Sequence, residues 1–136
     1  MTGEEARERF AAARVARLAT ADAGGRPHVV PIAFALDGDR LYSAVDSKPK
    51  RTTELRRLAN VRENPRVAVL VDRYDDDDWS ALWWARADGA GRVLEPDDPE
   101  ARRAAELLRD RYPRIEPIGA VLAVDVERWS GWAAQH

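Results

Sequence analysis

The sequence has no cysteine among its 136 residues, which excludes disulfide bonds, thiolate metal sites and cysteine nucleophiles. It has only two histidines, His28 and His136, and they leave no plausible Ser-His-Asp set or metal cluster. No apolar run approaches the length of a transmembrane helix, and the first residues are acidic and polar, unlike a signal peptide. These absences predict a soluble cytoplasmic protein that does not contact a membrane.

The composition is that of one ordered globular domain spanning residues 1–136. Hydrophobic residues make up 45% of the chain, enough for a substantial core. The formal net charge is −2, which argues against a general nucleic-acid binder, although a local basic patch is compatible with that average. Five tryptophans are present, a high number for a domain of this length.

The lysine and arginine residues that could bind an anion are concentrated in one segment, residues 41–72. A short strand at 41–45 is followed by a compact cationic loop with Lys48, Lys50 and Arg51, and then by a basic helix. Amide groups at a helix start and neighbouring ammonium and guanidinium groups can point at the same anion. The segment therefore predicts a phosphate site, and its alternative interpretation is an ordinary solvated basic helix.

Hydrophobic periodicity and turn residues predict three helices and six strands. The helices are expected at residues 4–13, 52–62 and 98–111, and the strands at 15–20, 27–36, 40–45, 66–72, 81–94 and 119–129. The first three strands are expected to form an antiparallel meander, the fourth to be central, and the fifth to bend near Asp88 and Gly89. Short turns argue against a parallel sheet. The fold class is therefore mainly β (α+β), a six-stranded antiparallel split β-barrel with flanking helices, because closure removes exposed sheet edges.

Several motifs, in this order, resemble one known family. The strand GGRPHVVPI, the LYSAV strand, the SKPKR loop and the NPRVAVLVD strand are similar to the split-barrel flavin-binding superfamily of pyridoxamine-phosphate oxidase. The stretches RYDDDDWSALWWARADGAGRVL and ERWSGW resemble an actinobacterial branch that uses the deazaflavin coenzyme F420. The resemblance covers nearly the whole chain. It implies a homodimer with cofactor sites at the subunit interface, and the high tryptophan content agrees with a covered apolar surface.

The resemblance also implies where the cofactor would bind. The positions that it assigns to the cofactor are Ser43, Ala44, Val45, Lys48, Lys50 and Arg51, with Arg57 as an alternative cation. Trp83 and Trp84 are adjacent on a strand and face opposite sides, so one is expected in the core or the dimer interface and the other, Trp84, in the wall of the cofactor pocket. Lys50 and Arg51 would hold the phosphate, but in the commoner pattern the phosphate lysine lies closer to the Asn-Pro pair, where Arg56 or Arg57 stands here. Either the loop pair, Lys50 and Arg51, or the helix pair, Arg56 and Arg57, could therefore bind the phosphate. His28, on a strand after a glycine-rich turn, is expected to be a surface or packing residue.

The implied activity is hydride transfer between a bound cofactor and a small organic substrate, with no catalytic side chain required. The chain lacks the arginine and histidine pair that the vitamin B6 oxidases carry near the C-terminus, which argues against that substrate. Coenzyme F420 carries more negative charge than FMN, so the many cations favour F420, with FMN as the alternative. A second alternative is a protein that carries a flavin, deazaflavin or haem without turnover, and a third is a protein-interaction or nucleic-acid domain that uses the basic helix.

Overall fold

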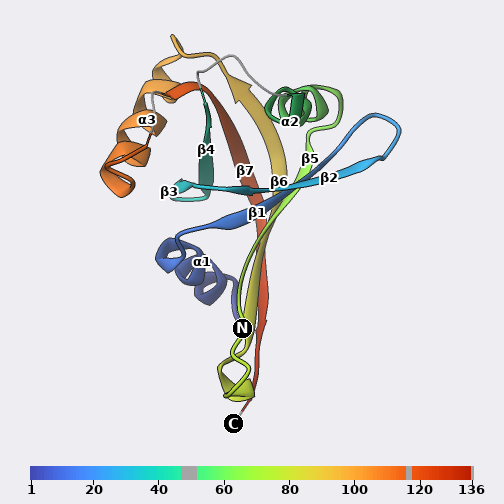
Figure 1. Cartoon of the computed structure of the whole chain (residues 1–136), viewed down its shortest axis with the longest axis vertical. Coiled ribbons are helices and arrows are strands. Elements are labelled where there is room, and N and C mark those ends of the chain that lie inside the picture. Colours follow the sequence, from blue (N-terminus) through green and yellow to red (C-terminus); the bar gives the residue numbers. More distant parts are fainter. Residues whose placement is uncertain (47–51, 116–117, 136) are drawn as a thin grey trace.

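The computed structural model describes residues 1–46, 52–115 and 118–135, with side chains described outside 45–46 and 52–55. These residues form one antiparallel sheet flanked by three α-helices (Figure 1). The helices are α1 (Gly3–Ala12), α2 (Thr52–Glu63) and α3 (Pro99–Arg111), with a short 3-10 helix η1 (Trp79–Ala81). The strands are β1 (Ala16–Ala21), β2 (Pro27–Ile32), β3 (Ala35–Asp37), β4 (Arg40–Asp46), β5 (Arg66–Arg73), β6 (Trp83–Leu94) and β7 (Ile118–Ala133). Within these ranges no helix is both long enough and apolar enough to cross a membrane.

The strand order explains how the sheet closes on itself. Neighbouring strands follow the order β2-β1-β5-β6-β7-β4-β3, so the two outermost strands, β2 and β3, are consecutive in the chain. Only Ala33 and Phe34 separate them, and the chain therefore carries one edge of the sheet across to the other (Figure 1). The mainly β barrel architecture predicted from the sequence is confirmed, with seven strands instead of six.

The prediction of one continuous strand over residues 27–36, and of a three-stranded meander, is wrong. β2 pairs with β1, whereas β3 pairs with β4 on the opposite edge of the sheet. The break falls at Phe34, whose backbone N–H donates to the Tyr112 hydroxyl at 3.2 Å and whose carbonyl accepts from it at 3.0 Å. Because a side chain satisfies both backbone groups, Phe34 does not need a strand partner.

Two other expectations for the sheet are confirmed. β5 lies inside the sheet, between β1 and β6, and its alternate residues Val67, Val69 and Val71 are buried. β6 has a register shift against β7 between Asp88 and Gly89. A Cβ added at Gly89 would lie 2.2 Å from the Asp125 carbonyl oxygen, so this close approach of two strands requires glycine.

The main core is formed by the inner side chains of the barrel together with residues of α1 and α2. Thr2 caps α1 and forms a capping box with Glu5, and the helix buries Phe10 completely. The Phe10 ring makes edge-to-face contacts with Phe34 and Trp129, at centroid distances of 5.8 and 5.2 Å. The N-terminal helix thus covers the apolar interior where the β2–β3 link crosses it.

Candidate functional site

The predicted basic helix, α2, is held against the hairpin that joins β1 and β2. The Asn60 side-chain amide donates to the Thr20 hydroxyl at 3.1 Å, and both residues are buried. Near the end of the helix, Glu63 accepts from the Ala23 backbone N–H at 3.2 Å. A buried, satisfied polar pair fixes relative position more strictly than apolar packing does. The hairpin and α2 therefore form a defined surface, on the right of Figure 1.

Between the hairpin and α2 lies a cleft of about 170 Å³, which we call the cationic cleft. Its lining residues are Asp22, Arg26, Pro27, His28, Arg56 and Asn60. Arg26 and Arg56 approach from different elements, and neither forms an ion pair with another residue in the described ranges. The buried His28 Nδ1 has no hydrogen-bond partner within the same ranges. The cleft therefore offers two guanidinium groups to a ligand, and His28 forms part of its wall.

Asp22 is the acidic residue of this cleft, and its carboxylate is already engaged. It accepts a hydrogen bond from the Arg26 backbone N–H at 2.9 Å. That bond, with the charges of Arg26 and Arg56, lowers the pKa of Asp22 below its usual value. Asp22 is thus a fixed anion that shapes the turn, and the two guanidinium groups leave the cleft with a positive balance. An anion is the ligand that this balance favours.

The residues predicted from β4 have mixed placements. Ser43 is buried and pairs with Leu122 on β7, so its side chain belongs to the barrel wall. Ala44 is partly buried and pairs with Val121. The backbone of Val45 continues β4 up to an irregularity between Ala44 and Asp46, and its side chain lies outside the described part. The structure does not test whether Ser43, Ala44 and Val45 contact a cofactor, so this role stays a prediction.

The predicted cations divide into two groups. Lys48, Lys50 and Arg51 lie outside the described residues, so the structure does not test them. Arg57 lies on α2 and is partly buried. Arg56, which the sequence offered as an alternative to the loop cations, lines the cationic cleft.

Trp84 lies far from the end of β4. It pairs with Trp132 near the end of β7, whereas Ser43 pairs with Leu122, ten residues earlier on the same strand. At the usual strand rise, ten residues span roughly 33 Å. Trp84 and Ser43 of the same chain therefore do not share one pocket, and a common site for them requires a second copy of the chain.

Sequence reasoning missed Arg26, His28 and Asn60 as members of one cleft. Arg26 and His28 follow a glycine-rich hairpin turn, whereas Asn60 lies more than thirty residues later, on α2. The antiparallel pairing of Thr20 with His28 and the Thr20–Asn60 hydrogen bond bring them together. A buried asparagine within a basic amphipathic helix is a signal for such a contact, because a buried amide needs a partner.

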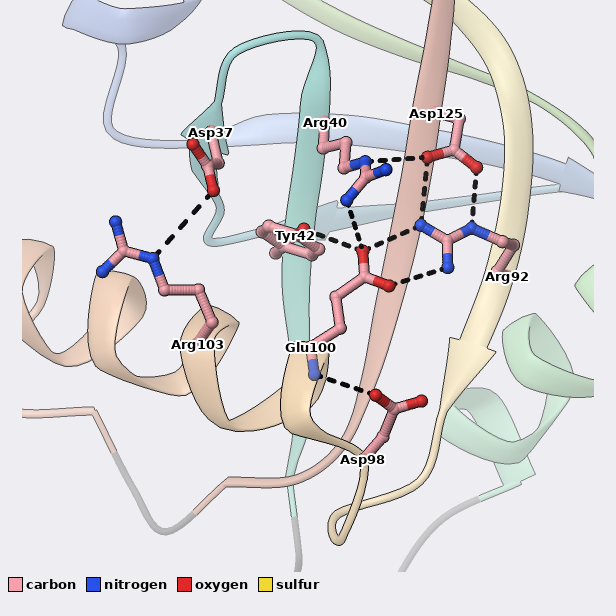
Figure 2. A network of polar contacts seen from close by, with 8 residues as sticks. All are labelled: Asp37, Arg40, Tyr42, Arg92, Asp98, Glu100, Arg103 and Asp125. Atoms are coloured by element: carbon pink, nitrogen blue, oxygen red, sulfur yellow. Dashed lines mark hydrogen bonds and ion pairs between the residues drawn. The ribbon is translucent and has the colours of Figure 1, made fainter.

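A second cluster of charged residues lies where α3 meets the barrel (Figure 2). The Arg92 guanidinium donates to both Glu100 oxygens, at 3.0 and 2.9 Å, and to both Asp125 oxygens, at 2.7 and 3.0 Å. Tyr42 donates to Glu100 at 2.8 Å, and Arg40 lies 3.6 Å from both Glu100 and Asp125. These residues come from β4, β6, β7 and α3, and the cluster joins α3 to the barrel.

Glu100 is the strongly perturbed acid of this cluster. The hydrogen bonds from Arg92, followed by that from Tyr42, lower the pKa of Glu100 to about 2. Such a carboxylate remains ionised at neutral pH and cannot exchange a proton there. Its bidentate pairing leaves it no free role as a base, so we assign the cluster to structure. In the described ranges no group of three His, Asp or Glu residues could hold a metal ion.

Comparison with known proteins places the chain in a family. A model described as pyridoxamine 5'-phosphate oxidase matches residues 2–133, and the chain belongs to this family. A curated relative from Streptomyces rimosus, named a 5a,11a-dehydrotetracycline/5a,11a-dehydrooxytetracycline reductase, is 39% identical over 105 residues, covering 76% of this chain and 72% of the relative.

Solved structures share the fold. A FAD-binding protein of Mesorhizobium loti aligns with a TM-score of 0.70 and 28% identity over 96% of this chain and 94% of that one. The haem storage protein of Vibrio cholerae aligns with a TM-score of 0.71 and 17% identity over 98% and 95% of the two chains. The family and the reductase relative support an oxidoreductase, and the flavin-binding neighbour supports a flavin-type cofactor.

Proposed function

We propose that this member of the pyridoxamine 5'-phosphate oxidase family is a coenzyme F420-dependent oxidoreductase that reduces a small organic substrate. The observation that carries the proposal is the cationic cleft. Its arginines, Arg26 and Arg56, project from two different elements without ion-pair partners among the described residues. FMN is the alternative cofactor in the same place.

The cleft fits part of such a cofactor. Pockets that enclose a complete drug-sized ligand measure about 300–1,000 Å³, whereas the cationic cleft measures about 170 Å³. That volume suits a phosphate and the chain attached to it, and the two guanidinium groups suit its charge. The ring of the cofactor would lie outside this cleft.

The bound ring supplies the hydride chemistry. The residues of this chain bind and orient: Arg26 and Arg56 hold the anionic end, and the buried Asn60–Thr20 pair keeps α2 at a fixed distance from the hairpin. Asp22, with its lowered pKa, remains ionised and holds the turn that presents Arg26. None of these roles requires proton transfer by a side chain.

Charge favours F420 over FMN in this proposal. Coenzyme F420 has a phosphodiester and a glutamate tail, whereas FMN has one phosphate. The segment that leads into α2 contributes Lys48, Lys50 and Arg51 to the sequence, in addition to the arginines of the cleft. One phosphate needs fewer cations than this segment provides.

Titration of the purified protein with F420 and with FMN, followed by fluorescence, tests the proposal. The double variant Arg26→Ala/Arg56→Ala should bind its cofactor at least about a hundredfold more weakly, because it loses two charge-assisted hydrogen bonds that are each worth roughly 1.5–3 kcal/mol. The matched control is Arg7→Ala/Arg128→Ala, which removes the same charge elsewhere. Equal affinity of the two double variants, or no binding of either cofactor by the wild type, would contradict the proposal.

The same titration distinguishes the contribution of the loop cations, Lys50 and Arg51, to cofactor affinity from that of the helix cations, Arg56 and Arg57. Lys50→Ala/Arg51→Ala and Arg56→Ala/Arg57→Ala should both weaken binding if the anionic cofactor spans the loop and the cleft, and the loss should diminish at high salt because salt screens charge. If only the helix pair matters, the phosphate lies at the cleft. If neither pair matters, the phosphate interpretation of the whole segment is wrong.

We also propose that the protein is a homodimer with the cofactor at the interface. Trp84 lies roughly 33 Å from Ser43 along β7, so both can contact one cofactor only if each comes from a different subunit. Trp79 and Trp132 are exposed in the single chain, at 68% and 48%. Light scattering should give twice the mass of one chain at micromolar concentration, and a monomer would refute this.

A non-catalytic carrier of flavin, deazaflavin or haem is the alternative supported by the fold neighbours. For haem, the cationic cleft is too small for a porphyrin at about 170 Å³. Turnover distinguishes a carrier from an enzyme. Oxidation of the reduced cofactor, accelerated by a candidate substrate in the presence of the protein, supports the reductase, and unchanged oxidation over a range of substrates supports the carrier.

A further inference from the structure

A larger cavity, of about 490 Å³, lies on another part of the molecule. It is bounded by the segment after α1, the link between β2 and β3, and the segment after α3, which meet near β3 in Figure 1. Its lining residues are Arg14, Ala33, Tyr112, Pro113, Arg114 and Ile115. The volume lies in the range of pockets that hold small organic ligands.

Tyr112 gives this cavity a fixed wall. Its hydroxyl bonds to Phe34, as described above, and lies 3.0 Å from the Arg14 carbonyl oxygen. The Arg14 guanidinium lies over the Tyr112 ring at 4.6 Å and donates to the Arg111 carbonyl at 2.8 Å. Three segments distant in the sequence are thus tied to one ring, so the cavity is preformed and does not depend on a single loop.

The lining combines apolar carbon with positive charge. Ala33, Pro113, Ile115 and the Tyr112 ring provide apolar surface, and Arg14 and Arg114 provide cations, whereas none of the six lining residues is acidic. Arg114 has no ion pair or hydrogen bond with any described residue. Such a lining complements a ligand with a flat apolar body and a negative group, since guanidinium groups bind carboxylates and sulfonates and also stack on rings.

The cavity is separate from the cationic cleft. Ala33 lies just beyond β2, five residues after His28, which lines the cleft. At the usual strand rise this separation is roughly 17 Å. An anion held by Arg26 and Arg56 therefore does not occupy the cavity, and the two sites can be tested independently.

We propose that this cavity is a second ligand site, which binds a small aromatic carboxylate or sulfonate. The ring lies against Tyr112, Ile115 and Ala33, and the negative group meets the guanidinium groups at the rim. The proposal does not depend on the choice between F420 and FMN, nor on whether the protein turns over a substrate.

The probe is anilinonaphthalene sulfonate, whose fluorescence rises in apolar surroundings, and phenylnaphthylamine is its uncharged counterpart. Arg114→Glu should weaken sulfonate binding about tenfold, because attraction becomes repulsion, and should leave the uncharged probe unaffected. Arg128→Glu is the matched control, since Arg128 is also exposed and makes the same change in net charge elsewhere. Ala33→Trp fills the cavity and should weaken both probes.

Equal sulfonate affinity for Arg114→Glu and Arg128→Glu would overturn the proposal, because exposed tryptophans elsewhere would then explain the fluorescence. Circular dichroism checks the fold of Ala33→Trp. If that variant unfolds, the proposal is tested by the sulfonate affinities of Arg114→Glu and Arg128→Glu alone. Cofactor titration of Arg114→Glu should match the wild type. A loss of cofactor affinity there would place Arg114 in the cofactor site and overturn the separation of the two sites.

Discussion

Replacing Glu100 with glutamine should destabilise the fold through the loss of one charge. The substitution keeps the shape of the side chain, but it replaces the bidentate pairing with at most one neutral hydrogen bond, because the new NH2 group cannot accept from Arg92. Arg92 then retains only Asp125 as a charged partner, which it shares with Arg40. The reduced negative charge leaves two guanidinium groups close together, which raises their mutual repulsion.

The magnitude follows from the pKa of Glu100. Its ordinary value of 4.5 falls to about 2 in the folded protein, and at about 1.4 kcal/mol per pH unit this difference corresponds to at most roughly 3–4 kcal/mol. The Glu100 side chain remains 23% exposed, and its partners are more exposed, so screening by water reduces the effect. We expect a loss of about 1–2 kcal/mol in the free energy of unfolding at pH 7.

Urea denaturation of wild type and Glu100→Gln across a pH series tests this reasoning. The folded-state pKa is depressed, so the stabilisation is complete above pH 4.5 and disappears as the pH falls through the folded value of about 2. The difference between the two proteins should therefore shrink below pH 4.5. Glu106→Gln is the control, because Glu106 is exposed and its one ion-pair partner in the described part of the chain is Arg103 on the same helix, and it should cost less than about 0.5 kcal/mol. A difference that persists undiminished near pH 2 would show that charge is not the cause.

Two further substitutions probe the sheet and the docking of α2. Gly89→Ala brings a methyl group within 2.2 Å of the Asp125 carbonyl and should cost at least about 2 kcal/mol in thermal unfolding, whereas Gly24→Ala, in the exposed turn, should be nearly neutral. Asn60→Leu leaves the buried Thr20 hydroxyl unsatisfied and should cost about 1–3 kcal/mol in urea. Adding Thr20→Val should recover part of that loss, and no recovery would refute the role of the hydrogen bond.

Elements governed by local signals could be predicted from the sequence. Helix α3 begins where Asp98 caps it, with the Asp98 carboxylate accepting from the Glu100 backbone N–H at 2.8 Å. The irregularity at Asp88 and Gly89 was predicted from the glycine. The break at Phe34 was not, because its cause is Tyr112, 78 residues away in the sequence. Local propensity contains no information about a partner so distant.

In the candidate site, too, local features could be predicted from the sequence, whereas contacts between distant segments could not. The cations of the basic helix, Arg56 and Arg57, came from the family resemblance as an alternative to the loop cations, and Arg56 does line a cleft. Arg26 and His28 were not assigned, because their relevance depends on which face of the β1–β2 hairpin meets α2. That face is set by a buried hydrogen bond between Asn60 and Thr20, forty residues apart. Residue patterns predict elements, whereas such pairings between elements decide which side chains share a cleft.

The contrast between the two charged clusters is the main physical argument for a ligand. Around Arg92, the cations Arg40 and Arg92 face the carboxylates of Glu100 and Asp125, and each charge has a partner. In the cationic cleft, Arg26 and Arg56 approach one carboxylate, which the turn backbone already engages. Two guanidinium groups beside a single carboxylate leave the cleft with a net positive charge. A bound anion would balance this charge, and that is the role that we propose for the cofactor.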